Sequence, residues 1–247
     1  MKRKGKQRVR NVEKYKKYFT KEYMMGPNAL RLLSEIVEDN PQAASKGNVL
    51  DLGCGAALSS IFLANETTAD TVWALDLWVS PTDNLKRIRE NGLEDKIIPI
   101  HGDALALPFA HEYFDTVVSV DTYHYFGCEE NVFAEKILPF IKKGGYALFV
   151  VPGLKEEPKG EMKSLMDEWA TDEAYMFKTE EWWEKHITKN CAEDVEVNIY
   201  ESANFDLVWQ EWFDSGHEYG ARDKEFLERG LKDILNFVMM VIRRKEK

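Results

Sequence analysis

From residue 48 to residue 151, short apolar runs alternate with stretches that have helical spacing. The five apolar runs lie at residues 48–52, 71–77, 96–101, 114–120 and 146–151. They are mainly apolar throughout, which is typical of strands covered on both faces of a sheet. The stretches near residues 58–65, 82–91 and 130–141 are expected to be helices. This alternation predicts a parallel sheet with right-handed crossover helices.

The flanking regions predict further helices and two more strands. Before the core pattern, residues 12–38 have helical spacing with a break at residues 24–28, and Asn28 is expected to cap a second helix. After Pro152, we expect helices near residues 161–170, 179–188, 205–213 and 223–236, and strands at 195–202 and 237–243. We therefore predict one domain with an N-terminal helical arm or lid (1–47), a core (48–152) and a helical cap with the last two strands (153–247).

The charge balance argues against a general nucleic-acid binder. The 247 residues include 33 Lys and Arg against 43 Asp and Glu, a net charge of −10, whereas a protein that neutralises many phosphates is usually basic. Residues 1–21 are an exception, because they hold ten basic side chains and a single acid, Glu13. This arm could hold nucleic acid or an anionic substrate. We favour the alternative of a solvated tail.

The cysteines and the apolar runs indicate the compartment. Cys54, Cys128 and Cys191 are an odd number without a C-x-x-C spacing, so we expect neither a disulfide framework nor a metal site. The first residues lack the apolar segment of a secretory signal, and no apolar run approaches the ~20 residues needed to span a bilayer. We expect a cytoplasmic protein without membrane contact. No feature of the sequence specifies an oligomeric state.

A glycine turn follows the first predicted strand, in the sequence VLDLGCGAAL. Glycines at such a turn allow unusual backbone angles and the close approach of a ligand. A dinucleotide-binding loop would read G-x-G-x-x-G, but Leu58 stands at the third glycine position, and Asp51 precedes Gly53 by two residues. That carboxylate would repel a pyrophosphate and attract a cation. The turn therefore favours a positively charged nucleoside without phosphates, such as S-adenosylmethionine.

Two further acids follow the next predicted strands. Asp76 comes 21 residues after Gly55 and could accept both hydroxyl hydrogens of a ribose, or it could be an ordinary helix-cap or loop carboxylate. Asp103 could accept a hydrogen bond from an adenine amino group, while the Ala104 amide meets a ring nitrogen. On its own, the sequence Gly-Asp-Ala is a common turn.

Together, the segments VLDLGCG, ALDLW, GDALALPF, FDTVVSVDTYHYF and LPFIKKGGYALFVVP resemble the class I S-adenosylmethionine-dependent methyltransferases over about residues 48–151. The resemblance implies an α/β fold with a Rossmann-like, doubly wound, seven-stranded sheet that is mostly parallel with a reversed last strand. A segment of about 35 residues between the last two strands departs from the family pattern and is expected to be an inserted helical cap. The cofactor implied is S-adenosylmethionine, with S-adenosylhomocysteine as its product. The cofactor contacts implied are Asp51, Gly53, Gly55, Asp76, Leu77, Asp103, Ala104 and Val120, or Asp121 in place of Val120.

The segment SVDTYHYFG follows the fourth predicted strand, at the edge where open α/β sheets bind their ligands. Asp121, Tyr123 and His124 are the catalytic candidates. His124 could take a proton from the acceptor, and Tyr123 and Tyr125 could form aromatic walls for a cation. Alternatively, the loop packs against the sheet with His124 bonded to backbone. Residues 25–27 would fold over the cofactor, as the family resemblance implies.

These features predict a methyltransferase acting on a small-molecule acceptor, with nucleic acid an unlikely partner. The alternative is an RNA- or protein-modifying methyltransferase that uses the basic arm, followed by a non-enzymatic cofactor-binding module. Neither N-P-P-Y nor D-P-P-Y occurs in the sequence, which argues against a DNA adenine or a protein glutamine as the acceptor. Five of the seven tryptophans lie between residues 169 and 212. They could line an acceptor pocket, but we favour a small satellite core under the cap helices.

Overall fold

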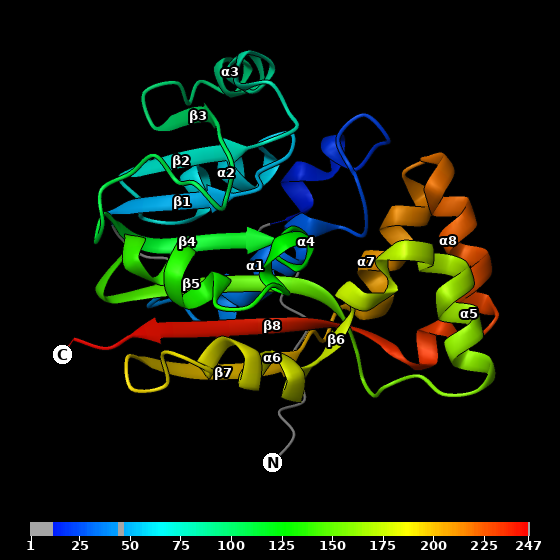
Figure 1. The fold of residues 1–247 in the computed structure, drawn as a ribbon. Coiled ribbons are helices and arrows are strands. Elements are labelled where there is room, and N and C mark those ends of the chain that lie inside the picture. The colour runs from blue at the N-terminus through cyan, green and yellow to red at the C-terminus, as the bar shows by residue number, and fades with distance from the viewer. Residues whose placement is uncertain (1–11, 44–46, 247) are drawn as a thin grey trace.

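A single twisted sheet runs through the centre of the molecule, with helices on both faces and a helical group beyond one edge (Figure 1). The computed structural model describes residues 12–43 and 47–246. The strand order along the sheet is β3-β2-β1-β4-β5-β8-β7. The strands are β1 (Asn48–Leu52), β2 (Thr71–Asp76), β3 (Ile97–His101), β4 (Phe114–Val120), β5 (Ile141–Leu154), β6 (Lys178–Thr179), β7 (Val195–Glu201) and β8 (Leu235–Arg244).

The strand directions confirm the predicted class of sheet. Strands β1 to β5 are mutually parallel, and β8 lies antiparallel between β5 and β7, with Val241 opposite Leu148 on one side and Asn198 on the other. Only β8 is therefore reversed, since β7 runs in the same direction as β5. The two-residue β6, which the sequence did not indicate, pairs with the end of β5.

The apolar strands are explained by two hydrophobic layers. Val49, Val118 and Leu148 point into one layer, together with α1 (Ala29–Asp39) and α2 (Leu58–Glu66). Their neighbours Leu50, Val117 and Phe149 point into the other layer, with the π-helical turn η2 (Val132–Ile137) and the helix α6 (Glu180–Thr188). Successive side chains of a strand alternate between faces, so a strand that is apolar throughout requires cover on both. The helix α3 (Pro81–Glu90) lies beside β3 at the sheet edge (Figure 1).

Three predicted helices differ from the structure. At residues 130–141, η2 is a π-helical turn, a 3-10 turn (η3, Leu138–Phe140) follows, and β5 already begins at Ile141. Pro139 within η3 has no N–H to donate to a helix. At residues 223–236, the helix ends at Glu228, because Gly230 has φ +126° and β8 begins at Leu235. Between residue 12 and α1, the structure has only the 3-10 turn η1 (Glu13–Tyr18) where a helix was expected.

The helical cap lies beyond the carboxyl ends of the parallel strands (Figure 1). It consists of α5 (Glu161–Ala170), the 3-10 turn η4 (Thr171–Met176), α7 (Phe205–Asp214), α8 (Glu218–Glu228) and the 3-10 turn η5 (Leu231–Asp233). Trp169, Trp209 and Trp212 are buried within the cap, where Trp169 and Trp212 each donate a 2.8 Å hydrogen bond to the carboxylate of Asp223. These three tryptophans therefore pack the cap.

Two other observations concern the cysteines and the length of the apolar helices. Cys54, Cys128 and Cys191 are all unpaired. Within residues 12–43 and 47–246, no helix has the length and apolar character needed to cross a membrane.

Candidate active site

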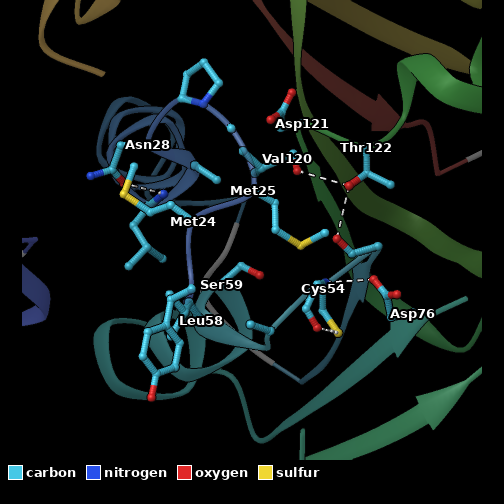
Figure 2. Close-up of a pocket in the computed structure, with 18 of the residues that line it drawn as sticks. Met24, Met25, Asn28, Cys54, Leu58, Ser59, Asp76, Val120, Asp121 and Thr122 are labelled. Carbon is cyan, nitrogen blue, oxygen red and sulfur yellow. Dashed lines mark hydrogen bonds between the residues drawn. The ribbon is translucent and has the colours of Figure 1, made fainter. Parts of the chain in front are cut away.

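A cleft lies at the carboxyl ends of β1, β2 and β4, beneath the segment that leads into α1 (Figure 2). Three stretches line it: the N-terminal segment, the glycine turn after β1, and the residues that follow β2 and β4. The lining residues are Phe19, Tyr23, Met24, Met25, Gly26, Pro27, Asn28, Ala29, Leu30, Gly53, Cys54, Gly55, Ala56, Leu58, Ser59, Asp76, Trp78, Val120, Asp121, Thr122 and Tyr125.

The glycine turn is shaped by positive backbone angles. Gly53 has φ +77° and Gly55 has φ +52°, a region that favours glycine. A Cβ on Gly53 would lie 2.1 Å from Cγ2 of Thr122, so no other residue fits there without movement. A Cβ built on Gly55 would meet Sδ of Met25 at 3.5 Å and no other atom within 4 Å among the described residues beyond its chain neighbours. The turn therefore offers bare backbone to a ligand in the cleft.

Asp51 supports this turn from behind and does not line the cleft. Its buried carboxylate accepts hydrogen bonds from the hydroxyls of Ser59 at 2.6 Å and Ser60 at 2.5 Å, at the start of α2. Burial raises the pKa of this carboxyl to about 6, against the opposing effect of the two hydroxyls. The sequence suggested direct contact with a cationic ligand, whereas the structure places the carboxylate among the serines that anchor the helix.

Asp76 does face the cleft, and it also fixes the glycine turn. One carboxylate oxygen accepts from the Gly55 amide at 2.8 Å, and the other accepts from the amides of Trp78 and Val79, both at 2.8 Å. The loop-carboxylate alternative is thus present in the structure. Oδ1 already accepts two hydrogen bonds, whereas Oδ2 accepts one and can accept another from a ligand.

Besides Asp51, three more of the expected cofactor contacts lie outside the lining of the cleft. Leu77 is exposed to solvent, and so is Asp103, whose carboxylate accepts from the Leu105 amide at 2.8 Å. Ala104 is half-buried against the second hydrophobic layer. Gly53, Gly55, Asp76 and Val120 are the expected contacts that the structure brings together.

Asp121 lies in the cleft directly after β4. Its backbone has φ +55°, and its amide donates to the Val150 carbonyl at 2.8 Å, so the residue turns out of the sheet at its edge. A Cβ on Gly26 would lie 2.7 Å from Oδ2 of Asp121, which places the carboxylate directly against the N-terminal segment. Burial, and secondarily the negative charge of Asp223, raise the pKa of Asp121 to about 7.

Tyr123 and His124, the other catalytic candidates, are buried and lie outside the lining of the cleft. Tyr123 is completely buried in the second hydrophobic layer, stacked on Phe149 with ring centroids 4.4 Å apart. His124 begins the short helix α4 (His124–Gly127), and burial lowers the pKa of its imidazole to about 3, which keeps the ring neutral. Neither residue lines the cleft, so their positions do not support a catalytic role. Tyr125, two residues after Tyr123, does reach it.

The N-terminal segment covers the glycine turn, as the sequence suggested for residues 25–27. Figure 2 shows the side chain of Met25 pointing toward the turn at Cys54. Asn28 caps α1 by accepting from the amides of Leu30 and Arg31. Its side-chain amide also donates to Glu211 of α7 at 2.7 Å. Phe19, Tyr23 and Met24 line the cleft as well, although no motif marked them in the sequence.

The side chains around the cleft fit a cationic nucleoside better than a phosphorylated one. Asp76 and Asp121 are carboxylates, and no lysine, arginine or histidine lines the cleft within the part of the chain that the structure describes. Phosphate groups are bound in proteins mainly by cationic side chains and clustered backbone amides. A sulfonium nucleoside such as S-adenosylmethionine needs neither. Across residues 12–43 and 47–246, no group of His, Cys, Asp or Glu side chains is placed to hold a metal ion.

Comparison with known proteins identifies the same class. Residues 49–145 match a family described as a methyltransferase domain. A curated relative, the fatty-acid O-methyltransferase of Mycolicibacterium smegmatis, is 35% identical over 103 residues, which are 41% of this chain. The matched part spans 35% of the relative, or about a third of its length.

Several solved structures share the fold over most of this chain. A putative sarcosine dimethylglycine methyltransferase from Galdieria sulphuraria has a TM-score of 0.70 and 16% identity, covering 88% of this chain and 87% of its own. The phosphoethanolamine N-methyltransferase 2 of Haemonchus contortus, in complex with S-adenosyl-L-methionine, has a TM-score of 0.70 and 19% identity, covering 91% and 54%. The geranyl diphosphate C-methyltransferase of Streptomyces coelicolor has a TM-score of 0.67 and 17% identity, covering 87% and 80%. These identities show a common fold.

Residues 49–145 therefore carry a methyltransferase domain, and the sheet order and the glycine turn are those of the class I S-adenosylmethionine-dependent methyltransferases.

Proposed function

We propose that this protein transfers a methyl group from S-adenosylmethionine to a small-molecule acceptor, releasing S-adenosylhomocysteine. The observation that carries the proposal is the cleft itself. In it, a bare glycine turn, the carboxylate of Asp76 and the carboxylate of Asp121 meet under residues 24–28. The methyltransferase domain implies the cofactor, and the cleft supplies a place where cofactor and acceptor can meet.

The residues of the cleft divide the work of such a reaction. When bound, S-adenosylmethionine supplies an activated methyl group, so the protein has to align the acceptor and exclude water. Gly53, Gly55 and Asp76 would hold the nucleoside, with the second lone pair of Oδ2 of Asp76 available to a ribose hydroxyl. Val120 and Asp121 lie at the carboxyl end of β4, across β1 from Asp76, where the methyl group and the acceptor would meet.

The enclosure of the cleft supports a small acceptor. Residues 24–28 cover the glycine turn from one side, and the cap lies beyond the same sheet edge. The relatives are named for fatty acid, sarcosine, phosphoethanolamine and geranyl diphosphate, all small molecules. An RNA or protein acceptor would have to use the basic arm, most of which lies outside the described residues. A cytoplasmic location without membrane contact remains part of the proposal.

Two measurements test the proposed function. Isothermal titration should show binding of S-adenosylmethionine and S-adenosylhomocysteine, and mass spectrometry should detect labelled methyl groups in a small-molecule fraction of cell extract. Binding of NAD or ATP, with no affinity for either S-adenosyl compound, would refute the proposal. Removal of residues 1–11 should leave transfer to small molecules intact. A loss of activity with steep salt dependence would instead favour a nucleic-acid acceptor.

A further inference from the structure

The carboxylate of Asp121 has no bonding partner among the described residues, and it lies where the acceptor would enter the cleft. Asp76 already accepts three backbone N–H groups, whereas no hydrogen bond or ion pair joins the carboxylate of Asp121 to another described residue. Asp121 nevertheless lies in the cleft wall against Gly26, shielded by the N-terminal segment. A shielded carboxylate without a partner is a costly arrangement, and it is relieved when a cation binds.

The surroundings of Asp121 deepen this negative character. Asp223 of α8 adds a second negative charge to its field, and both oxygens of Asp223 are held by the neutral N–H groups of Trp169 and Trp212. The guanidinium of Arg31, which does not line the cleft, is paired with both Glu211 and Glu13, so this group of three carries no net positive charge. Across the described residues, the charged groups of the cleft are therefore all anionic.

The rest of the cleft mouth is aromatic and apolar. Trp78 and Tyr125 are both exposed at the rim and contact each other edge to face, with ring centroids 5.5 Å apart. Met25 is also exposed and lines the same cleft. Aromatic faces attract cations, and apolar surface favours a hydrocarbon substituent.

We propose that the methyl acceptor is an amine carrying an apolar substituent, and that the carboxylate of Asp121 receives its proton. The ammonium form binds to the anionic cleft and gives one proton to Asp121, leaving a neutral amine with a free electron pair. That pair forms the new nitrogen–carbon bond as the carbon–sulfur bond breaks, and the electrons of the broken bond remain on sulfur. The product is an N-methylammonium ion, and Asp121 then returns its proton to solvent. This inference rests on the proposed methyltransferase function.

The same charges argue against the other acceptor types that occur among the relatives. A fatty-acid carboxylate or a diphosphate would bring a second negative charge toward Asp121 and Asp223, with no cation in the described cleft wall to offset it. The raised pKa of Asp121, near 7, also suits a group that accepts and releases a proton at neutral pH.

A set of matched probes tests the charge preference directly. n-Hexylamine, hexanol and hexanoate have the same chain and differ in charge, and each is titrated into the complex with S-adenosylhomocysteine while tryptophan fluorescence is recorded. We expect hexylamine to bind at least about tenfold more tightly than hexanoate, with hexanol between them. Asp121→Asn should abolish that preference while changing the affinity for S-adenosylhomocysteine by less than about threefold. Asp83→Asn, which removes an exposed carboxylate on α3 outside the cleft, should behave like the wild type.

The outcomes separate this inference from the function on which it rests. Failure of the wild type to bind S-adenosylhomocysteine would overturn the proposed function. Binding of S-adenosylhomocysteine without a preference for hexylamine over hexanoate would overturn the amine inference alone. A loss of more than about tenfold in S-adenosylhomocysteine affinity in Asp121→Asn would also overturn it, because the carboxylate would then serve the ammonium group of the cofactor.

Discussion

Glu211 of α7 ties the N-terminal segment to the cap, and its replacement by glutamine tests how the cleft is closed. Its carboxylate accepts from Nε of Arg31 at 2.9 Å, from Nη2 of Arg31 at 2.6 Å, and from the side chain of Asn28 at 2.7 Å. Asn28 both lines the cleft and caps α1, so Glu211 acts on the cleft through it. The side chain of Arg31 is only 4% exposed, which makes its charge sensitive to the loss of a partner.

The expected magnitude follows from the partners that remain. Leaving a buried charge without its partner costs about 3–5 kcal/mol. In Glu211→Gln, Arg31 keeps its 2.6 Å ion pair with Glu13 and can still donate to the amide oxygen, so we expect the free energy of unfolding to fall by about 2 kcal/mol. If most of that free energy is lost from the closed conformation of residues 24–28, the affinity for S-adenosylhomocysteine should drop about tenfold.

Glu35 of α1, the helix that carries Arg31, provides a matched control. It accepts from the Ser202 hydroxyl at 2.6 Å, the Ala203 amide at 2.6 Å and the Asn204 side chain at 2.9 Å, and so joins α1 to the chain that enters α7. None of these four residues lines the cleft. Glu35→Gln should therefore lower stability by about 1–2 kcal/mol and leave the affinity within about twofold of wild type.

Three measurements are compared between the two variants: denaturant unfolding, calorimetric titration of S-adenosylhomocysteine, and hydrogen exchange in a peptide covering residues 23–30. Faster exchange and weaker binding are expected only in Glu211→Gln. Equal losses of affinity in both variants would show that general destabilisation is the cause. Unchanged exchange at residues 23–30 in Glu211→Gln would show that Glu211 does not hold the segment in place.

Three further predictions concern single residues of the cleft. Asp76→Ala should weaken S-adenosylhomocysteine binding by about tenfold or more in calorimetry, since a charge-assisted contact with the ribose is lost, and an unchanged affinity would remove that assignment. Because the pKa of Asp121 in the folded protein is about 7, above its unfolded value, its contribution to stability is present at low pH and is lost as the pH rises through about 7. The rate of methyl transfer should rise over that same pH range as the carboxylate ionises. The titratable neighbours of Asp121 are Asp223 and Tyr125. In pH titrations of Asp121→Asn, both the change in stability and the change in rate should be absent. Gly55→Ala should cost about 1–2 kcal/mol in thermal unfolding, because its φ of +52° is unfavourable for alanine, and an unchanged melting temperature would contradict that strain.

The strands were predictable because burial on both faces leaves a continuous apolar run. Five predicted strands and the last two agree with the structure to within a few residues, except that β5 begins at Ile141, five residues earlier than expected. The helices were less predictable where apolar spacing continued across a chain-breaking residue. Pro139 and Gly230 each end a helical stretch whose hydrophobic pattern runs on.

The site was predictable only where a local motif carried it. The glycine turn and Asp76 follow directly from a strand, so their position at the sheet edge could be inferred. After β4, the positive φ of Asp121 decides which of the next side chains face the cleft, and nothing in the sequence marks that angle. The tether between Arg31 and Glu211 joins residues 180 positions apart, and no periodic pattern connects them.

The position of β8 has a consequence for how the protein is made. This strand fills the gap between β5 and β7, yet it is synthesised after both of them, and its partner Leu148 is 93 residues away from Val241. Until β8 leaves the ribosome, β5 and β7 have unpaired edges that could join another chain. A nascent chain halted before Leu235 would thus be prone to aggregate, and rapid translation of the final segment would protect it.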